Sequence, residues 1–223
     1  MDLGTGAFAN LRSYVDYDRI GAVVISHMHA DHFIDLVPLR YALRYGGRKR
    51  RGKMPVYLPP DGTRMLRQLV SAFADEGGEF LSDVYDIKEY DPSKRLKIAA
   101  STITFAHTAH YIPAFAMRWE NNGSVITYSA DTAPDERVVA LARDSDVFLC
   151  EATLLHGEHE HGMRGHSTAV EAAEMAKAAG VRRLILTHYG DDSTSADLDQ
   201  PAAAEFSGEI IVADDHHVVD LSP

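Results

Sequence analysis

A dense group of titratable side chains follows directly after an apolar run near the N-terminus. The apolar run RIGAVVIS, residues 19–26, predicts a buried strand. The six positions that follow hold four polar side chains, namely His27, His29, Asp31 and His32. Placing four such groups at the end of a buried strand is costly unless partners satisfy them. Bound metal ions would remove that cost, so this stretch predicts a metal site.

The spacing H-x-H-x-D-H indicates two ions rather than one. Alternate residues of an extended chain point to the same side, so His27 and His29 can bind one ion together. Asp31 and His32 come where the chain turns into a helix, and they can serve a second ion. Imidazole and carboxylate donors suit zinc, manganese or iron.

Further donors stand at the ends of later apolar runs. His110 follows STITFAHTA, Asp131 lies in TYSADT, and His188 ends RRLILTH. A β-scaffold would present such strand ends together, and Asp131 could bridge two ions with its two oxygens. Two ions about 3.5–4 Å apart would form a hydrolytic site of the two-metal type. His107 lies in the same stretch as His110 and competes with it as a ligand.

Strand patterns alternate with a few helical ones along the whole chain. The stretches 32–45, 61–76, 134–143 and 167–180 predict helices, and 54–60, 146–152 and 182–188 predict strands. Several strands fill 83–130, where NNG predicts a hairpin turn. A closing hairpin is expected over 208–221, with ADDH at its turn. The fold class expected is α/β: one domain over 1–223, an αββα sandwich of two packed mixed sheets flanked by helices.

Charge and composition narrow the range of functions. The net charge of −11 disfavours non-specific nucleic-acid binding by the whole surface. Residues 40–53 nevertheless hold seven of the 22 basic residues and no acid. The loop 44–53, with Arg48, Arg50 and Arg51, could therefore grip a phosphate backbone, although a solvated face is the commoner reason for such a run.

The cysteine content and the apolar runs bear on the compartment. The only cysteine, Cys150, lies in the apolar run VFLCEAT and is expected to be a buried thiol. No run approaches the ~18 apolar residues of a membrane-spanning helix. These features predict a cytoplasmic protein without a membrane partner.

The metal motif and the later segments resemble one family. HMHADH, a following His, S-A-D-T and LTHY resemble the metallo-β-lactamase-fold hydrolases, from DLG near the N-terminus to the last hairpin. The resemblance implies a binuclear centre, usually zinc. One metal would take His27, His29 and His110, the other would take Asp31, His32 and His188, and Asp131 would bridge them. Because H-Y-I-P resembles the family's segment with a His three residues before a proline, His110 is preferred over His107.

Two later segments resemble the ribonuclease Z branch of that family. They are CEATLL, residues 150–155, and GHSTAVEAAEMAKAAGVRRLILTH, residues 165–188. The resemblance implies that Glu151 and His166 act as a pair. A phosphodiester leaving group needs a proton, and an imidazolium held by a carboxylate can donate one. Metal-activated hydroxide would attack phosphorus, Asp31 would orient or deprotonate the attacking water, and His166 would protonate the leaving oxygen.

The chain also departs from that branch. Ribonuclease Z enzymes usually carry a long arm before the S-x-D-T segment, and here only residues 119–128 separate Arg118 from Ser129. A smaller phosphodiester than tRNA is therefore at least as plausible as RNA. S-A-D-T replaces the family's S-G-D-T, which is expected to matter little. The family fold normally begins with one or two strands before D-x-G, whereas this sequence starts at that segment. The first sheet is then expected to lack edge strands, which would lower stability or favour pairing with another chain, as in a homodimer.

Other functions and other histidines stay open at this point. The same fold could hydrolyse a thioester or lactone, could act with iron as a sulfur dioxygenase, or could be a non-catalytic binding module. Diiron flavoproteins fit less well because they place Glu where His29 stands. The glycine-rich stretch with His156, His159 and His161 could be a lid or a solvated loop. His216 and His217 are expected to lie in a turn.

Overall fold

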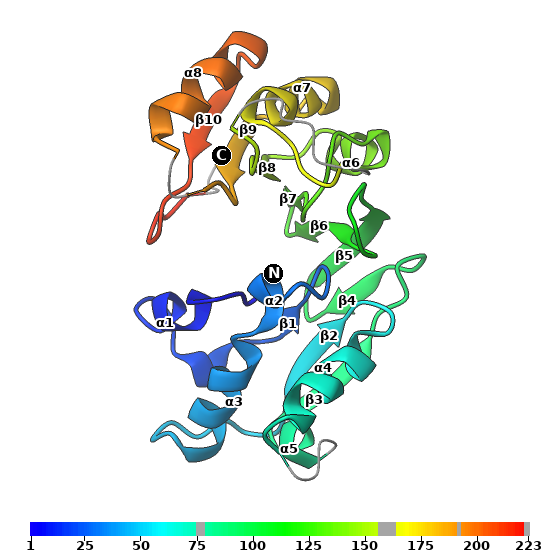
Figure 1. The fold of residues 1–223 in the computed structure, drawn as a ribbon, viewed down its shortest axis with the longest axis vertical. Helices are drawn as coiled ribbons and strands as arrows, with labels where there is room; N and C mark the ends of the chain where they lie inside the picture. The colour runs from blue at the N-terminus through cyan, green and yellow to red at the C-terminus, as the bar shows by residue number, and fades with distance from the viewer. Residues whose placement is uncertain (75–78, 156–163, 191–192, 221–223) are drawn as a thin grey trace. The chain divides into compact units, whose positions relative to one another are not determined.

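The computed structural model describes the chain except for residues 75–78, 156–163, 191–192 and 221–223 (Figure 1). His156, His159 and His161 lie outside the described residues. The chain forms two units, residues 1–91 and 92–223. Each unit has a hydrophobic core of its own, and each is described by itself.

The N-terminal unit is built on a three-stranded parallel sheet. Its order is β1-β2-β3, with bounds Val23–Val24, Met54–Leu58 and Tyr85–Glu89. Its helices are α1 Ala7–Leu11, the 3-10 helix η1 Tyr17–Arg19, α2 Ala30–Phe33, α3 Leu36–Tyr45, α4 Gly62–Ser71 and α5 Glu79–Ser82. The strand predicted over 19–26 is reduced to the two residues of β1, and η1 overlaps the predicted range only at Arg19.

The helix predicted over 32–45 consists of two pieces. α2 ends at Phe33, and α3 begins at Leu36. Pro38 lies in the first turn of α3, where its missing N–H removes no hydrogen bond that the helix would otherwise make. The donors of H-x-H-x-D-H are therefore divided between the loop after β1 and the single helical turn of α2.

The C-terminal unit is built on a seven-stranded mixed sheet of order β10-β9-β8-β7-β6-β5-β4. The strands are β4 Leu96–Ile98, β5 Ser101–His107, β6 Phe115–Asn121, β7 Ser124–Tyr128, β8 Val147–Glu151, β9 Arg183–Thr187 and β10 Glu209–Val212. The pairs from β4 to β7 are antiparallel. The pairs from β7 to β10 are parallel.

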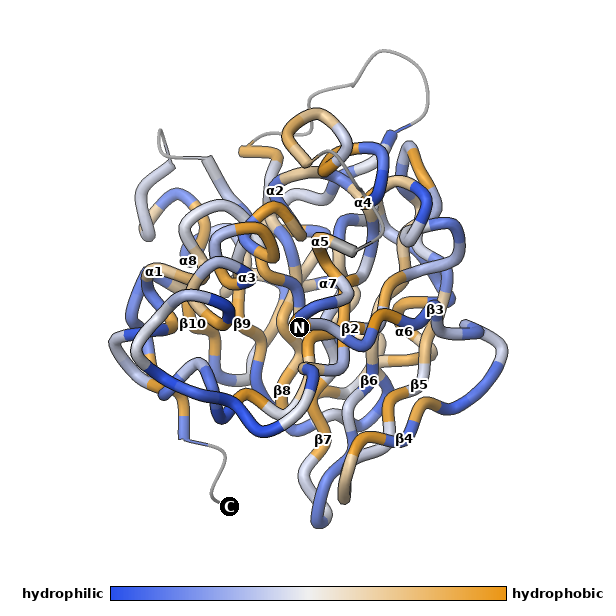
Figure 2. Tube along the Cα trace, turned by 90° about the horizontal axis from the view of Figure 1, so that it is seen from below, coloured by the Kyte–Doolittle hydropathy of each residue, from blue (hydrophilic) through white to orange (hydrophobic). Residues whose placement is uncertain are grey.

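Three helices pack against this larger sheet. They are α6 Glu136–Ala142, α7 Ala169–Ala179 and α8 Ser195–Glu205. α6 contacts β5 to β7, α7 contacts β8 and β9, and α8 contacts β10 and α7 (Figure 1). The strands beneath them are hydrophobic, as β8 and β9 show in Figure 2. Within the described residues, no helix has the length and apolar character needed to cross a membrane.

The expected burial of Cys150 is confirmed. The side chain lies in the core of the C-terminal unit with no exposed surface. Burial raises the pKa of the thiol well above its ordinary value, and the neighbouring Glu151 carboxylate adds to the rise. Because reactivity depends on the thiolate, Cys150 is a packing residue.

The NNG signal correctly locates a tight hairpin. β6 ends at Asn121 and β7 begins at Ser124, so only Asn122 and Gly123 form the turn. Both have positive φ, of 50° and 87°, as a two-residue hairpin with the twist of its strands requires. The chain therefore has no arm at this position.

The C-terminal prediction is wrong in one respect. No closing hairpin forms, because β10 pairs in parallel with β9 and residues 213–220 contain no strand. Val218 is 72% exposed, so the apolar letters of this segment do not mark a buried strand. His216 and His217 lie exposed in a turn, as expected.

α8 is a helix that the sequence patterns did not reveal. Pro201 stands inside it, and a proline normally argues against a helix interior. The helix begins with a capping box in which Thr194 and Asp197 each accept a backbone hydrogen bond.

The N-terminus of α7 is held by a capping box and by an ion pair. Thr168 Oγ1 accepts from the N–H of Glu171, and Glu171 Oε2 accepts from the N–H of Thr168. The Arg164 guanidinium donates to both carboxylate oxygens of Glu171. Burial alone would raise the pKa of Glu171, but hydrogen bonds from Arg164 and Thr168 outweigh it and lower the pKa below its ordinary value.

Glu171→Gln should lower stability in a pH-dependent way. Glutamine can still close the capping box but cannot pair with Arg164. A lowered carboxylate pKa stabilises the fold above the unfolded value of about 4.5 and loses that effect as the pH falls through the folded pKa. Urea unfolding should show a deficit of about 1 kcal/mol or less at pH 7 that shrinks toward pH 4. A deficit that is the same at both pH values would contradict this account.

Candidate metal centre

Five strands of the C-terminal unit, β5 and β7 to β10, end at the same edge of their sheet, and four of them lead into candidate site residues. β7, β8 and β9 are parallel neighbours, and β5 runs in the same direction because it is antiparallel to β6, which is antiparallel to β7. The side chains at or just after these four ends are His110, Asp131, Glu151 and His188. The topology therefore gathers the polar residues that the sequence placed at the ends of apolar runs.

The two oxygens of Asp131 face two different histidines. Oδ2 lies 3.8 Å from His110 Nε2, and Oδ1 lies 3.7 Å from His188 Nε2. Donors about 2.1 Å from a tetrahedral zinc lie about 3.4 Å from each other. These separations are too long for good hydrogen bonds but suit pairs of ligands that share an ion. The arrangement fits a carboxylate that bridges two metals.

Each of these histidines has its other ring nitrogen occupied. His110 Nδ1 lies 2.9 Å from the carbonyl oxygen of Gly165, to which it can only donate. His188 Nδ1 lies 2.8 Å from Thr153 Oγ1. Fixing Nδ1 in this way leaves Nε2 as the ligand atom, as is usual for metal-binding imidazoles.

The loops that carry Asp131 and His188 contain left-handed backbone. Ala130 has a φ of 52° and His188 a φ of 57°. Non-glycine residues adopt this region at a cost, and such strain collects at functional sites. Glycine would be unstrained at the φ of position 130, whereas alanine is not. The change from S-G-D-T to S-A-D-T therefore has a conformational cost that was not expected. Thr108 Oγ1, which donates to the carbonyl oxygen of Asp131 over 2.8 Å, helps to hold the loop.

Glu151 and His166 form the predicted pair. His166 Nδ1 lies 3.0 Å from Glu151 Oε1. Glu151 is fully buried and accepts four further hydrogen bonds, from the N–H groups of Thr132, Thr153 and Ser167 and from the Thr153 hydroxyl. A carboxylate with five donors cannot rotate, so it fixes the imidazole of His166.

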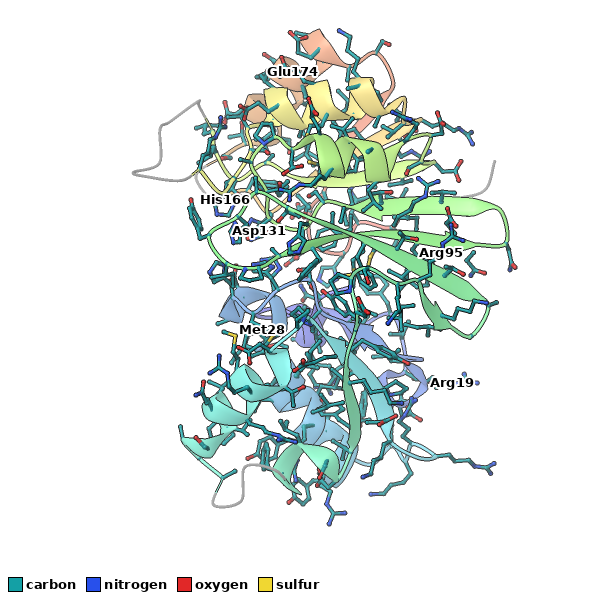
Figure 3. All side chains as sticks on the ribbon, turned by 90° about the vertical axis from the view of Figure 1, so that its right-hand side faces the viewer. Arg19, Met28, Arg95, Asp131, His166 and Glu174 are labelled. Atoms are coloured by element: carbon teal, nitrogen blue, oxygen red, sulfur yellow. The ribbon has the colours of Figure 1, made fainter. Side chains whose placement is uncertain are left out.

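His166 lies among the metal-binding candidates of its unit. Asp131, His166 and His188 offer ligand atoms that lie within 4.8 Å of one another. Figure 3 labels Asp131 and His166. The His166 ring stacks on that of His188 at 5.9 Å and meets that of His110 edge-on at 5.1 Å. A proton on His166 could therefore be delivered next to a metal that these residues hold.

The N-terminal unit presents its own donor pairs. His27 Nε2 lies 3.2 Å from His29 Nδ1, and His32 Nε2 lies 3.5 Å from Asp31 Oδ2. Both separations again suit ligands of a shared ion. His27 and His32 are buried, whereas the Asp31 side chain is 56% exposed. The two pairs adjoin each other, because the ring centroids of His27 and His32 lie 4.0 Å apart, so the division of these donors between two ions stays a prediction.

Asp2 is a site residue that the sequence patterns did not single out. Its carboxylate accepts from Ser26 N and Ser26 Oγ, at 2.6 and 2.7 Å, and pairs with His32 Nδ1 at 2.8 Å. Burial alone would raise its pKa, but the hydrogen bond and charge of His32 and the bonds from Ser26 lower the pKa below its ordinary value. Asp2 thus orients His32 so that Nε2 faces Asp31.

Gly4 explains the spacing of the D-x-G segment. A Cβ at this position would lie 1.6 Å from the carbonyl oxygen of Asp31. The segment also pairs with the motif through Leu3 N, which donates to the carbonyl oxygen of His32 over 2.8 Å. Only glycine lets the N-terminal segment approach this closely.

Other predicted site residues are placed differently. The His107 ring packs on Phe115, with centroids 4.4 Å apart, and His110 instead lies beside Asp131. Arg50 donates to the carbonyl oxygens of Asp18 and Ile20, so its guanidinium anchors the basic loop. Arg48 pairs with Asp16 at 2.7 Å, and Arg51 is exposed.

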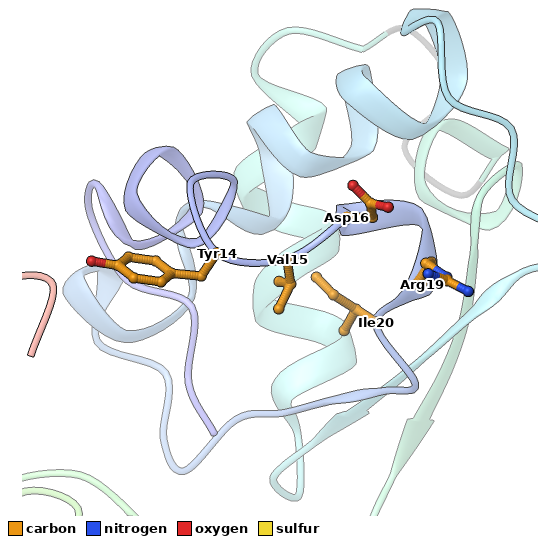
Figure 4. A pocket seen from close by; sticks show the side chains of 5 residues that line it. All are labelled: Tyr14, Val15, Asp16, Arg19 and Ile20. Atoms are coloured by element: carbon orange, nitrogen blue, oxygen red, sulfur yellow. The ribbon is translucent and has the colours of Figure 1, made fainter. Parts of the chain in front are cut away.

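A surface pocket of the N-terminal unit lies apart from these donors in sequence. It is lined by Tyr14, Val15, Asp16, Arg19 and Ile20 (Figure 4). These described lining residues include a single carboxylate and no histidine. The pocket therefore lacks the donor set that a metal needs.

Comparison with known proteins gives three informative relatives. The sequence model described as a beta-lactamase superfamily domain matches residues 3–189. "Uncharacterized protein Rv1339" of Mycobacterium tuberculosis is 35% identical over 213 residues, which cover 94% of this chain and 76% of the relative. "Ribonuclease Z" of Myxococcus xanthus is 26% identical, covering 99% of this chain and 87% of the relative.

The third relative has also been solved as a crystal structure. "Probable metallo-hydrolase YhfI" of Bacillus subtilis is 27% identical, covering 96% of this chain and 84% of the relative. Its crystal structure, described as a metallo-beta-lactamase fold protein, superposes with a TM-score of 0.83 at 26% identity, covering 96% of this chain and 83% of that one.

Glu151→Gln should destabilise the C-terminal unit strongly. The glutamine amide would turn its NH₂ group toward N–H and O–H donors that now meet a carboxylate oxygen. Breaking a buried charged network in this way lowers the free energy of unfolding by about 3–5 kcal/mol. Glu174→Gln, on the exposed side of α7, makes the same chemical change outside the network and should stay within about 0.5 kcal/mol of wild type. Equal denaturation midpoints for the two variants would refute the central role of Glu151.

Proposed function

Because this chain belongs to the metallo-β-lactamase superfamily, as its motifs predicted, we propose that it is a binuclear-metal-dependent hydrolase and, more specifically, a phosphodiesterase. The α/β fold with two sheets agrees with that membership. The observation that carries the proposal is Asp131, whose two oxygens face His110 and His188 beside the Glu151–His166 pair.

The proposed ligand set follows the family resemblance. His27, His29 and His110 would hold one ion, Asp31, His32 and His188 would hold the second, and Asp131 would serve both. Support comes from the donor pairs inside each unit, whose separations of 3.2–3.8 Å suit shared ions. When bound, such ions make water nucleophilic at neutral pH and offset negative charge on phosphoryl oxygens. Imidazole and carboxylate donors favour zinc, with manganese or iron as alternatives.

His166 is the proposed proton donor. Its Nδ1 is tied to Glu151, so Nε2 is the nitrogen that can hold a proton and pass it to a leaving oxygen. The carboxylate stabilises the protonated ring and fixes its direction. Asp31 is exposed enough to meet solvent, and in this proposal it orients the attacking water.

The choice of a phosphodiester over a carbonyl substrate rests on His166 as the proton donor. An alkoxide leaves poorly from phosphorus unless it is protonated, which is the task that a Glu–His pair performs. A thiolate leaving from a thioester needs such help far less. Hydrolysis of a thioester or lactone by the same centre is the runner-up.

A small phosphodiester is favoured over tRNA. The two-residue turn between β6 and β7 stands where ribonuclease Z enzymes usually insert an arm. Two of the three arginines proposed for RNA contact are engaged with the protein, Arg50 with carbonyl groups and Arg48 with Asp16. RNA as a substrate would rest mainly on the exposed Lys49, Arg51 and Lys53.

His166→Ala should separate metal binding from proton donation. We expect the variant to retain its metals and to lose about 10²–10⁴-fold in turnover of phosphodiesters with alkyl leaving groups. The loss should be much smaller for bis-p-nitrophenyl phosphate, because nitrophenolate departs without a proton. The control is His107→Ala, which should keep wild-type rates because His107 is an exposed histidine of the same unit. An equal loss on both substrates would argue against His166 as the donor.

Metal removal should abolish activity reversibly. Chelation should remove about two ions per chain, and zinc should restore hydrolysis of bis-p-nitrophenyl phosphate. Asp131→Ala should bind fewer ions than wild type, because both sites lose the shared ligand. Parallel assays with a thioester, a lactone and an oxygen electrode cover the other reactions. Faster turnover of the thioester or lactone, or oxygen uptake by an iron-loaded enzyme, would overturn the phosphodiesterase assignment.

A further inference from the structure

We propose that Thr153 is a positioning residue, whose hydroxyl ties the metal ligand His188 to the same buried carboxylate that holds His166. The inference rests on the proposed function for the role of His188. It concerns a residue to which neither the sequence motifs nor the donor set gives a role.

The hydroxyl of Thr153 lies at the centre of a short hydrogen-bond chain. Its oxygen is 2.7 Å from Glu151 Oε2, 2.8 Å from His188 Nδ1 and 2.9 Å from the carbonyl oxygen of His188. The N–H of Thr153 also donates to Glu151 Oε2, over 3.1 Å. The residue is therefore clamped to the carboxylate by both its backbone and its side chain.

The donor and the acceptor in each of these hydrogen bonds follow from the number of hydrogens available. A hydroxyl has one hydrogen, and a carboxylate oxygen can only accept. Its hydrogen must go to an acceptor oxygen, either Glu151 Oε2 at 2.7 Å or the carbonyl oxygen of His188 at 2.9 Å, and the closer, charged carboxylate is the stronger acceptor. Thr153 Oγ1 can then only accept from His188 Nδ1, which must carry a proton. The lone pair of His188 is thereby assigned to Nε2, the atom 3.7 Å from Asp131 Oδ1.

His188 has particular need of this support. Its side chain is 31% exposed, whereas that of His110 is fully buried by its surroundings. Its backbone is also left-handed, so the loop itself does not favour the observed conformation. Besides the stacking with His166, the hydrogen bond to Thr153 is therefore an important constraint on the direction of the His188 ring.

The same carboxylate serves both histidines with different oxygens. Glu151 Oε1 holds His166 directly, and Glu151 Oε2 holds His188 through Thr153. Outer partners of this kind typically change metal affinity by 10- to 100-fold when they are removed. The geometry thus couples the proposed proton donor and a proposed metal ligand through one buried acid.

The test compares Thr153→Val, which removes the hydroxyl at constant shape, with Thr153→Ser, which retains it. Thr127→Val is the matched control, because Thr127 is a buried threonine whose hydroxyl bonds Ser145 Oγ. Zinc affinity is measured by chelator competition on the full chain. We expect Thr153→Val to bind one of two zinc ions about 10- to 100-fold more weakly, with Thr153→Ser and Thr127→Val close to wild type.

A second measurement does not depend on metal or activity. Nitrogen-15 NMR of the histidine rings in the metal-free protein, at a pH where they are neutral, reports which nitrogen carries the proton. Wild type and Thr153→Ser should show His188 protonated at Nδ1, and Thr153→Val should show a mixture of tautomers. The His110 signals should not change.

The outcomes separate this inference from the proposed function. Wild-type zinc affinity in Thr153→Val overturns the inference, and so does an equal loss in the Val and Ser variants, because the hydroxyl is then not the responsible group. A wild-type protein that binds no zinc overturns the proposed function. The NMR comparison still decides the inference in that case, since an unchanged His188 tautomer in Thr153→Val overturns it.

Discussion

The buried carboxylate of Glu151 is the interaction on which the rest of the C-terminal unit's site depends. Its five donors come from the loop after β7, the segment after β8 and the turn before α7, and these segments are distant in sequence. A charge without exposure to water is tolerable only when donors surround it in this way. Removing any one of these segments would leave the charge poorly satisfied, so the carboxylate makes the loops depend on one another.

The N-terminal unit uses the same device with a different acid. Asp2, whose side chain is 11% exposed, accepts hydrogen bonds from the N–H and hydroxyl of Ser26 and orients His32. Neither Asp2 nor Glu151 belongs to the proposed ligand set. In each unit, therefore, a carboxylate outside the proposed ligand set orients a histidine that would hold metal.

The parts of this arrangement that local sequence determines were predictable. The dense H-x-H-x-D-H motif, the donors at the ends of apolar runs, the NNG turn and the Gly180 end of α7 all follow from spacing, periodicity or backbone conformation. The roles of Asp2, Gly4 and Thr153 were not predictable, because each comes from contact with a segment far away in sequence. The expected final hairpin failed for a related reason: β10 found its partner in β9 rather than in its sequence neighbour.

The left-handed backbone at Ala130 and His188 has a consequence for engineering. Each position is held away from its intrinsic preference at a cost of about 1–3 kcal/mol, which the surrounding sheet must supply. The short S-A-D-T and L-T-H-Y segments would therefore not keep this backbone conformation by themselves in another protein. Grafted onto another scaffold, they would relax toward extended chain and turn their donors away. A working transplant would have to carry four strand ends together with the acid beneath them.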